Sequence, residues 1–222
     1  MTTIAIVGAG AGLGAKIAQR FGREGFDVAL ISRNQERLDS LAGDLATDGI
    51  RAKGFVANVR DATSLASALD RAGQELGPVE VLEYSPLPQK EFLRPILETT
   101  PADAAAAVEF SVLGPIAAVH QVLQGMRFLG RGTILFVNGG SAVRPTAKYA
   151  GTSISFAAES AYGTMLHDSL RVENIHVGQL IIPGAISAGH PRKDPSILAD
   201  TLWAMHAERG DFRRFADDMD AE

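Results

Sequence analysis

A glycine-dense turn near the start of the chain carries the clearest chemical signal in the sequence. The β-prone run Thr3–Val7 leads into it, and an amphipathic helix follows with Ile17 and Phe21 on one side. Glycines allow a tight turn and close approach to a pyrophosphate, and a helix start offers free N–H groups and partial positive charge. The pattern predicts a dinucleotide site, with a purely structural turn as the alternative. The residues expected to bind are Gly8, Gly10, Gly12, Leu13 and Gly14.

The end of the second predicted strand indicates which dinucleotide fits. Sites that prefer NAD(H) commonly place a carboxylate there, which accepts from the ribose 2′-OH. This chain has Ser32 and Arg33 and no acid at that point. A hydroxyl and a guanidinium can both bind a 2′-phosphate, so NADP(H) is favoured over NAD(H). The alternative for Arg33 is a solvated residue at a helix start.

Together these residues resemble the short-chain dehydrogenase/reductase family, and the similarity covers nearly the whole chain. The glycine turn matches the family's G-x-x-x-G-x-G, and Arg33 lies where NADP-dependent members often carry a basic residue. Asn58-Val59 stands where the family usually has Asp-Val. A later segment looks like the family's P-G-x-I-x-T, which contacts the nicotinamide end. The resemblance therefore implies further cofactor contacts from Asn58, Val59, Pro183, Gly184, Ile186 and Ser187.

The resemblance also implies a catalytic set, and most of that set is substituted. The family uses a Tyr-x-x-x-Lys pair on one helix face, assisted by a serine and by an asparagine on the preceding helix. No tyrosine in this chain is followed four residues later by lysine. Alignment back from the end of the helix places Phe156 at the tyrosine and Ser160 at the lysine. The asparagine position falls near Ser111, and Ser141 is the candidate for the serine.

A glutamate lies close to the expected cofactor. The family's Asn-Asn-Ala-Gly segment after the fourth strand is replaced by Glu83-Tyr84-Ser85-Pro86. A charged Glu83 would oppose an anionic cofactor unless the side chain turns away or is protonated.

The elements that must position these residues alternate along the chain. Strands are expected at residues 3–7, 28–31, 52–56, 79–82, 133–137 and 175–182, with a short edge strand near 212–215. Helices are expected after the glycine turn, at 34–46, 61–76, 153–172 and 197–207, and in a long stretch after Pro101 that contains the awkward Pro115. This alternation predicts a Rossmann-like α/β fold, a doubly wound, mostly parallel seven-stranded sheet with helices on both faces, in a single domain over residues 1–222. The short polar stretch 189–195 lies where the resemblance implies the family's substrate loop, and it predicts an open or poorly formed substrate lid, with a plain solvated loop as the simpler interpretation. Residues 217–222 are expected to form a frayed acidic tail.

Composition narrows the classes of function. The chain has 222 residues, 46% of them hydrophobic, a net charge of −5 and no basic run, which argues against a nucleic-acid partner. It has no cysteine, and its histidines lack metal-ligand spacing, so no metal site is expected. The apolar runs, such as 177–182, are too short to cross a bilayer, and no signal-peptide pattern opens the chain. We expect a cytoplasmic protein with no membrane contact.

Two functions from different classes remain open. The resemblance implies an NADP(H)-dependent oxidoreductase acting on an unknown small carbonyl or alcohol, with activity impaired or made atypical by Phe156 and Ser160. The alternative is a non-catalytic dinucleotide-binding sensor or scaffold, which those two substitutions favour. The family also forms dimers and tetramers through its long helices, so a homo-oligomer is expected.

Overall fold

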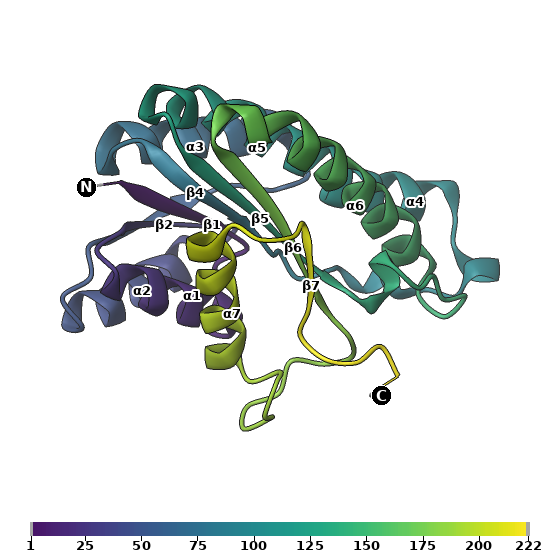
Figure 1. Cartoon of the computed structure of the whole chain (residues 1–222). Helices are drawn as coiled ribbons and strands as arrows, with labels where there is room; N and C mark the ends of the chain where they lie inside the picture. The colour runs from purple at the N-terminus through teal and green to yellow at the C-terminus, as the bar shows by residue number, and fades with distance from the viewer. Residues whose placement is uncertain (1, 221–222) are drawn as a thin grey trace.

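A seven-stranded sheet forms the centre of the computed structural model, which describes residues 2–220 (Figure 1). The strand order is β3-β2-β1-β4-β5-β6-β7, and all six strand pairings are parallel. The prediction of a doubly wound sheet is confirmed. The strands are β1 (Thr3–Val7), β2 (Asp27–Ser32), β3 (Ala52–Val56), β4 (Val79–Tyr84), β5 (Gly132–Gly139), β6 (Ile175–Ile182) and β7 (Arg213–Phe215).

Helices cover both faces of the sheet, so the central strands are apolar on both sides. In Figure 1 one layer lies above the sheet and the other below it. The first layer consists of α3 (Ala62–Leu76), α4 (Pro101–Val108), α5 (Gly114–Leu129) and α6 (Ala150–Leu170). The second consists of α1 (Leu13–Arg23), α2 (Gln35–Thr47) and α7 (Pro195–Glu208).

Short polar side chains fix where several helices begin. Asn34, Asp61 and Asp194 each accept a hydrogen bond from a backbone N–H in the first turn of α2, α3 and α7, respectively. Thr100 and Asp103 form a reciprocal capping box at the start of α4. These starts place the preceding loops at the carboxyl edge of the sheet, where ligands of such folds bind.

A π-helical segment, Glu109–Leu113, joins α4 to α5 and accounts for Pro115. The wider turn lets the Gly114 N–H donate to the Glu109 carbonyl, and Pro115 then falls in the first turn of α5, where its missing N–H costs nothing. The predicted long helix after Pro101 is thus confirmed, with one π-helical turn in its middle.

The continuous helical stretch Pro101–Leu129 is long and apolar enough to span a bilayer by length and composition. The prediction concerned uninterrupted apolar runs, and this stretch is not one, since Asp103, Glu109 and His120 interrupt it. Half of its most apolar window is buried inside the fold, where Val119 and Met126 pack into the core. Packing against the sheet explains its apolar character without a membrane.

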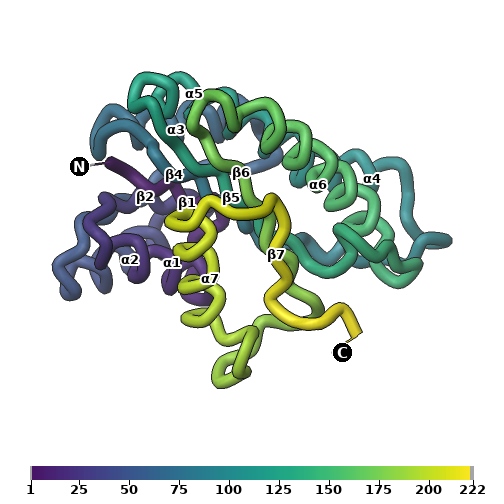
Figure 2. The backbone as a smooth tube through the Cα atoms, viewed as in Figure 1, coloured from purple at the N-terminus to yellow at the C-terminus, as the bar shows by residue number. Residues whose placement is uncertain are grey.

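The C-terminal segment is anchored, contrary to the expectation of a frayed tail. Beyond β7 the Ala216 N–H donates to the Ile181 carbonyl at 2.8 Å, and Asp217 is buried. Figure 2 follows this segment from β7 toward the C-terminus. Residues 221–222 of the predicted tail lie outside the described part of the chain.

Candidate active site

The glycine turn after β1 packs directly against the segment that follows β4. Gly8 has a φ of +104°, and a Cβ at this position would lie 2.6 Å from the backbone of Pro86. The N–H groups of Gly8 and Ala9 donate to the Ile31 carbonyl of β2. Only glycine satisfies both the backbone conformation and the close approach, so the turn lies at the switch point between β1 and β4.

The start of α1 presents uncapped N–H groups. Its N-cap residue is Gly12, which has no side chain to accept from the first turn, and that turn contains no acidic residue. Gly14 brings the helix close to the turn, since a Cβ there would lie 3.1 Å from the Ala9 Cα. Free donors and the helix dipole make this a suitable place for a pyrophosphate. Gly10 and Leu13 belong to the same turn and helix start.

The ends of β2 and β3 supply the residues expected around the adenosine half of a dinucleotide. Ser32 is half-buried at the end of β2, and Arg33 is exposed directly after it. Asn58 is exposed after β3, and its side-chain oxygen accepts from the Arg60 N–H at 3.2 Å. Val59 is buried beneath it. These side chains therefore share the carboxyl edge of the sheet with the glycine turn.

The segment after β6 forms the opposite side of the site. Pro183 is buried, Gly184 adopts a φ of +68°, and Ile186 and Ser187 are exposed. The interpretation of residues 189–195 as a plain solvated loop is wrong for Lys193. Lys193 is buried, and its Nζ donates to the Pro183 carbonyl at 3.2 Å.

Glu83 is fully buried on β4, and neither of its carboxyl oxygens has a hydrogen-bond partner among the described residues. Burial raises the pKa of Glu83 to about 8. The side chain is therefore mostly protonated at neutral pH. An uncharged Glu83 does not oppose an anionic ligand at the neighbouring glycine turn.

Phe156 faces the sheet rather than solvent. Its ring belongs to a small apolar cluster with Ala142, Ile181 and Met219 at the carboxyl ends of β5 and β6. Thr152 lies one turn earlier on α6, and its hydroxyl donates to the Tyr149 carbonyl at 3.2 Å. If the family pair is placed one turn earlier it becomes Thr152 and Phe156. Neither placement provides a phenol or an ammonium group.

Ser111 and Ser141 occupy different environments. Ser111 lies in the π-helical segment, and its buried hydroxyl has no partner among the described residues. Ser141 is half-buried in the short turn Gly140–Ala142 directly after β5. Ser141 therefore remains the hydroxyl nearest in sequence to the end of β5 and to the apolar cluster.

A series of hydrogen-bonded polar side chains starts at the exposed Arg213 and continues through buried residues near this cluster, and the sequence alone did not predict it. Arg213 on β7 donates to the Ser160 hydroxyl at 2.6 Å and to the Gln179 side-chain oxygen at 3.0 Å, and Ser160 donates to the same oxygen at 2.9 Å. Gln179 then donates to Asn138 at 2.8 Å, and Asn138 donates to Glu159 at 2.9 Å. Its residues come from β5, β6, β7 and α6, so no local sequence pattern predicts these hydrogen bonds.

Glu159 is the last residue of this hydrogen-bonded series, and its carboxyl group is buried. Burial raises the pKa of Glu159 to about 8, and its second oxygen has no partner among the described residues. Ser160, at the predicted lysine position, is committed to Gln179 and Arg213. It does not face a substrate as the family's lysine is expected to.

The sequence matches the profile of one known family. That profile, described as short chain dehydrogenase, matches residues 2–195. The chain belongs to the short-chain dehydrogenase family.

Characterised relatives of this short-chain dehydrogenase resemble it over part of their length. A 2,3-dihydro-2,3-dihydroxybenzoate dehydrogenase of Bacillus subtilis is 28% identical over 182 residues, which cover 81% of this chain and 68% of the relative. A 2-(S)-hydroxypropyl-CoM dehydrogenase of Xanthobacter autotrophicus is 37% identical over 141 residues, which cover 62% of this chain and 52% of the relative.

Solved structures of short-chain dehydrogenases share the fold along the whole chain. One from Rhodopseudomonas palustris superposes with a TM-score of 0.86 at 25% identity and covers 98% of each chain. The L-sorbose reductase of Gluconobacter frateurii, solved with NADPH and L-sorbose, gives a TM-score of 0.87 at 18% identity over 100% of this chain and 98% of the other. The second likeness establishes the fold alone.

Proposed function

We propose that this short-chain dehydrogenase binds NADP(H) and acts as an oxidoreductase on a small carbonyl or alcohol, with a weakened proton-transfer step. The observation that carries the proposal is the uncapped start of α1 inside the glycine turn, beside Ser32 and Arg33 and without an acid at the end of β2. The donors suit a pyrophosphate, and the hydroxyl and guanidinium suit a 2′-phosphate. The NADPH named for the sorbose reductase is consistent with this choice.

Each group of residues has a defined task in this proposal. The residues of the glycine turn and α1 hold the pyrophosphate, Ser32 and Arg33 hold the 2′-phosphate, and Asn58 lies beside the adenine. Pro183, Gly184, Ile186 and Ser187 line the nicotinamide end. A bound NADPH supplies the hydride. Ser141 orients the substrate oxygen, and water supplies the proton that this oxygen takes up after hydride transfer, because Phe156 has no proton to donate.

Titration of the purified protein with NADPH and with NADH tests the proposal. We expect saturable binding, followed by nicotinamide fluorescence, with the dissociation constant for NADPH about tenfold lower or more, since the 2′-phosphate adds charge-assisted hydrogen bonds. Equal affinities for NADPH and NADH would contradict the assignment of Ser32 and Arg33 to the 2′-phosphate. No binding of either dinucleotide at millimolar concentration would reject the cofactor site itself.

The second candidate function is a non-catalytic dinucleotide sensor or scaffold. The substitution of the family's catalytic pair by Phe156 and Ser160, both buried, favours it. Single-turnover oxidation of bound NADPH by a panel of activated ketones separates the two functions. Oxidation of NADPH above the rate without protein supports the enzyme, and dinucleotide binding without any oxidation supports the sensor.

The assembly is also proposed to be a homo-oligomer. Ile154, Ala158, Ala161 and Met165 recur every three or four residues along the exposed face of α6. Small and apolar side chains in such a stripe permit close packing against the same helix of a second copy. A cytoplasmic location, with no nucleic-acid or membrane partner, belongs to this proposal and rests on the sequence.

A further inference from the structure

The last described residues cross the carboxyl ends of β6 and β5. We call residues 216–220 the C-terminal strap. Met219 packs on Phe156 and Ala142, and its Cε would lie 3.1 Å from a Cβ on Gly140. Arg144 then holds the end of the strap through Asp220, at 2.6 Å. The strap therefore lies over the sheet edge at which the nicotinamide end of the proposed cofactor site is located.

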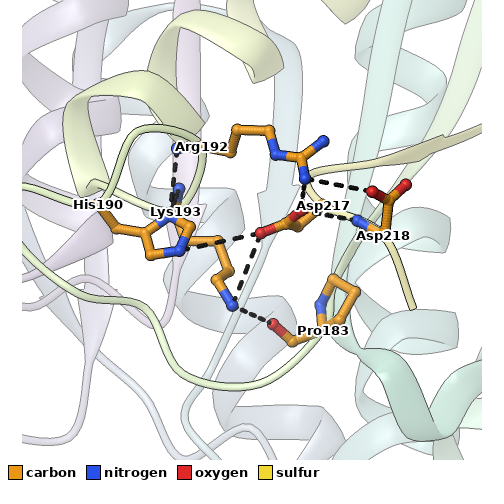
Figure 3. A network of polar contacts seen from close by, with 6 residues as sticks. All are labelled: Pro183, His190, Arg192, Lys193, Asp217 and Asp218. Atoms are coloured by element: carbon orange, nitrogen blue, oxygen red, sulfur yellow. Dashed lines mark hydrogen bonds and ion pairs between the residues drawn. The ribbon is translucent and has the colours of Figure 1, made fainter. Parts of the chain in front are cut away.

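Asp217 fixes the strap in a site lined by cations. Its side chain is only 3% exposed and forms ion pairs with Arg192 and with Lys193, whose Nζ is 3.8 Å away. The ring of His190 approaches the same carboxylate at 3.9 Å. Figure 3 shows the Lys193 ammonium between the Asp217 carboxylate and the Pro183 carbonyl. One buried carboxylate thus satisfies two cations of the loop after β6.

This cationic loop is also near the proposed pyrophosphate site. Hydrogen bonds from the N–H groups of Gly189 and Ser196 lower the pKa of Asp194, and the charge of Lys16 contributes to the same shift. The helix that follows the loop packs beside α1, since Arg20 of α1 pairs with Asp200 of α7 at 2.8 Å. Both helices begin at the carboxyl edge of the parallel sheet, so the loop before α7 and the glycine turn before α1 lie at the same edge. Lys193 donates to the Pro183 carbonyl at this edge, and Arg192 precedes it in the same loop.

We propose that Asp217 is an internal ligand, occupying an anion site of Arg192 and Lys193 that the phosphates of a dinucleotide take over when the strap leaves. The inference rests on the proposed function. The buried ammonium of Lys193 is costly without a counter-charge, so release of the strap is favourable only when another anion replaces the Asp217 carboxylate. The closed strap and the bound dinucleotide then exclude each other, and the closed state lowers the apparent affinity.

Two substitutions in the strap test this exclusion, with a third as the matched control. Asp217→Asn removes the charge, and Met219→Ala removes the apolar anchor. Asp218→Asn changes the neighbouring residue, whose side chain is 82% exposed and contacts Arg192 at 3.3 Å. We expect the first two variants to bind NADPH about tenfold more tightly, because a larger fraction of molecules is open. The control should change affinity less than twofold.

Trypsin cleavage after Arg213 and Arg214, located by mass spectrometry, reports release of β7 together with the strap that follows it, independently of affinity. Cleavage should accelerate in both test variants, and saturating NADPH should accelerate it in the unmodified protein. Slower cleavage with NADPH would mean that the strap closes over the ligand, and would overturn the proposal. Faster cleavage of Asp217→Asn with unchanged NADPH affinity would also overturn it while leaving the proposed function intact. If the unmodified protein and every variant fail to bind NADPH, the proposed function itself fails.

Discussion

Arg33 is the residue on which the cofactor preference depends most directly. It is exposed immediately after β2, where a carboxylate would select NAD(H), and Asn34 next to it caps α2. A guanidinium there has access to a 2′-phosphate without desolvating a buried charge. Its contribution should therefore concern NADPH alone.

We expect Arg33→Ala to weaken NADPH binding about tenfold and to leave NADH binding nearly unchanged, because one charge-assisted contact is worth about 1.5–3 kcal/mol. Arg37→Ala, in the first turn of α2, is the matched control and removes the same charge nearby. Fluorescence titration with both dinucleotides measures the effect. A comparable loss of affinity for NADH would show that Arg33 does not contact the 2′-phosphate.

The catalytic residues show where sequence reasoning reaches its limit. The absence of Tyr-x-x-x-Lys is visible in the sequence, and neither placement of the pair on α6 puts a phenol or an ammonium group at it. The buried acids are different. The sequence drew attention to Glu83 but not to its complete burial, and it gave no signal for Glu159, because burial depends on contacts between distant elements. The same holds for the pairing of Lys193 with Asp217.

At the scale of elements, the strands and helices could be predicted well because their patterns are local. β1, β3 and β6 begin and end where expected, since alternating apolar runs and glycine or proline boundaries define them. The π-helical segment was not foreseen. Pro115 signalled an irregularity, but the sequence did not show that a wider turn would absorb it.

Gly114 directly follows the π-helical segment, at a point where a side chain would not fit. A Cβ there would lie 2.4 Å from the Tyr84 hydroxyl and 2.6 Å from the Val59 carbonyl. Tyr84 cannot move away easily, because its buried hydroxyl donates to the Phe110 carbonyl at 2.5 Å. The segment thus brings α5 against the ends of β3 and β4, beside the proposed cofactor site.

We expect Gly114→Ala to lower the free energy of unfolding by about 1–3 kcal/mol through overpacking. Gly125→Ala, on the same helix, meets no atom within 4 Å and should raise it by about 0.5–1 kcal/mol through helix propensity. Urea denaturation of both variants measures the difference. Equal effects of the two substitutions would contradict the close approach at Gly114.

At the scale of the whole molecule, the two buried glutamates make stability depend on pH. The pKa of each rises from an ordinary 4.5 to about 8 on folding. Between these values the folded state keeps protons that the unfolded state has lost. Stability is therefore greatest below pH 4.5 as far as these groups are concerned, falls as the pH rises toward 8, and levels off above it.

Glu83→Gln should remove one of these two contributions. Between pH 5 and pH 8 the free energy of unfolding should fall less steeply in the variant than in the unmodified protein. The two slopes should differ by about 1.4 kcal/mol per pH unit, the value for one proton. Glu36→Gln, on the exposed start of α2, controls for the loss of one carboxylate. Guanidinium denaturation across this pH range measures the slope. An unchanged slope for Glu83→Gln would mean that Glu83 is ionised in the folded protein.

The exposed stripe on α6 governs the proposed assembly. Ala161→Arg places a long charged side chain in the middle of the stripe, where a second copy would have to bury it. We expect this variant to elute as a monomer in size-exclusion chromatography with light scattering, while Thr164→Arg, beside the stripe, keeps the larger mass. A monomeric unmodified protein would reject the oligomer.

The series of polar side chains from the exposed Arg213 to the buried Glu159 has a direction, because every hydrogen bond along it is donated away from the guanidinium. Rotating the amide of Asn138 or Gln179 alone would bring donor against donor or acceptor against acceptor. The orientation of both amides is thus inherited from one arginine on the edge strand. A short strand at the margin of the sheet thereby determines which way the polar groups beside α6 point. A residue at the edge of the fold thus fixes the orientation of amides in its interior.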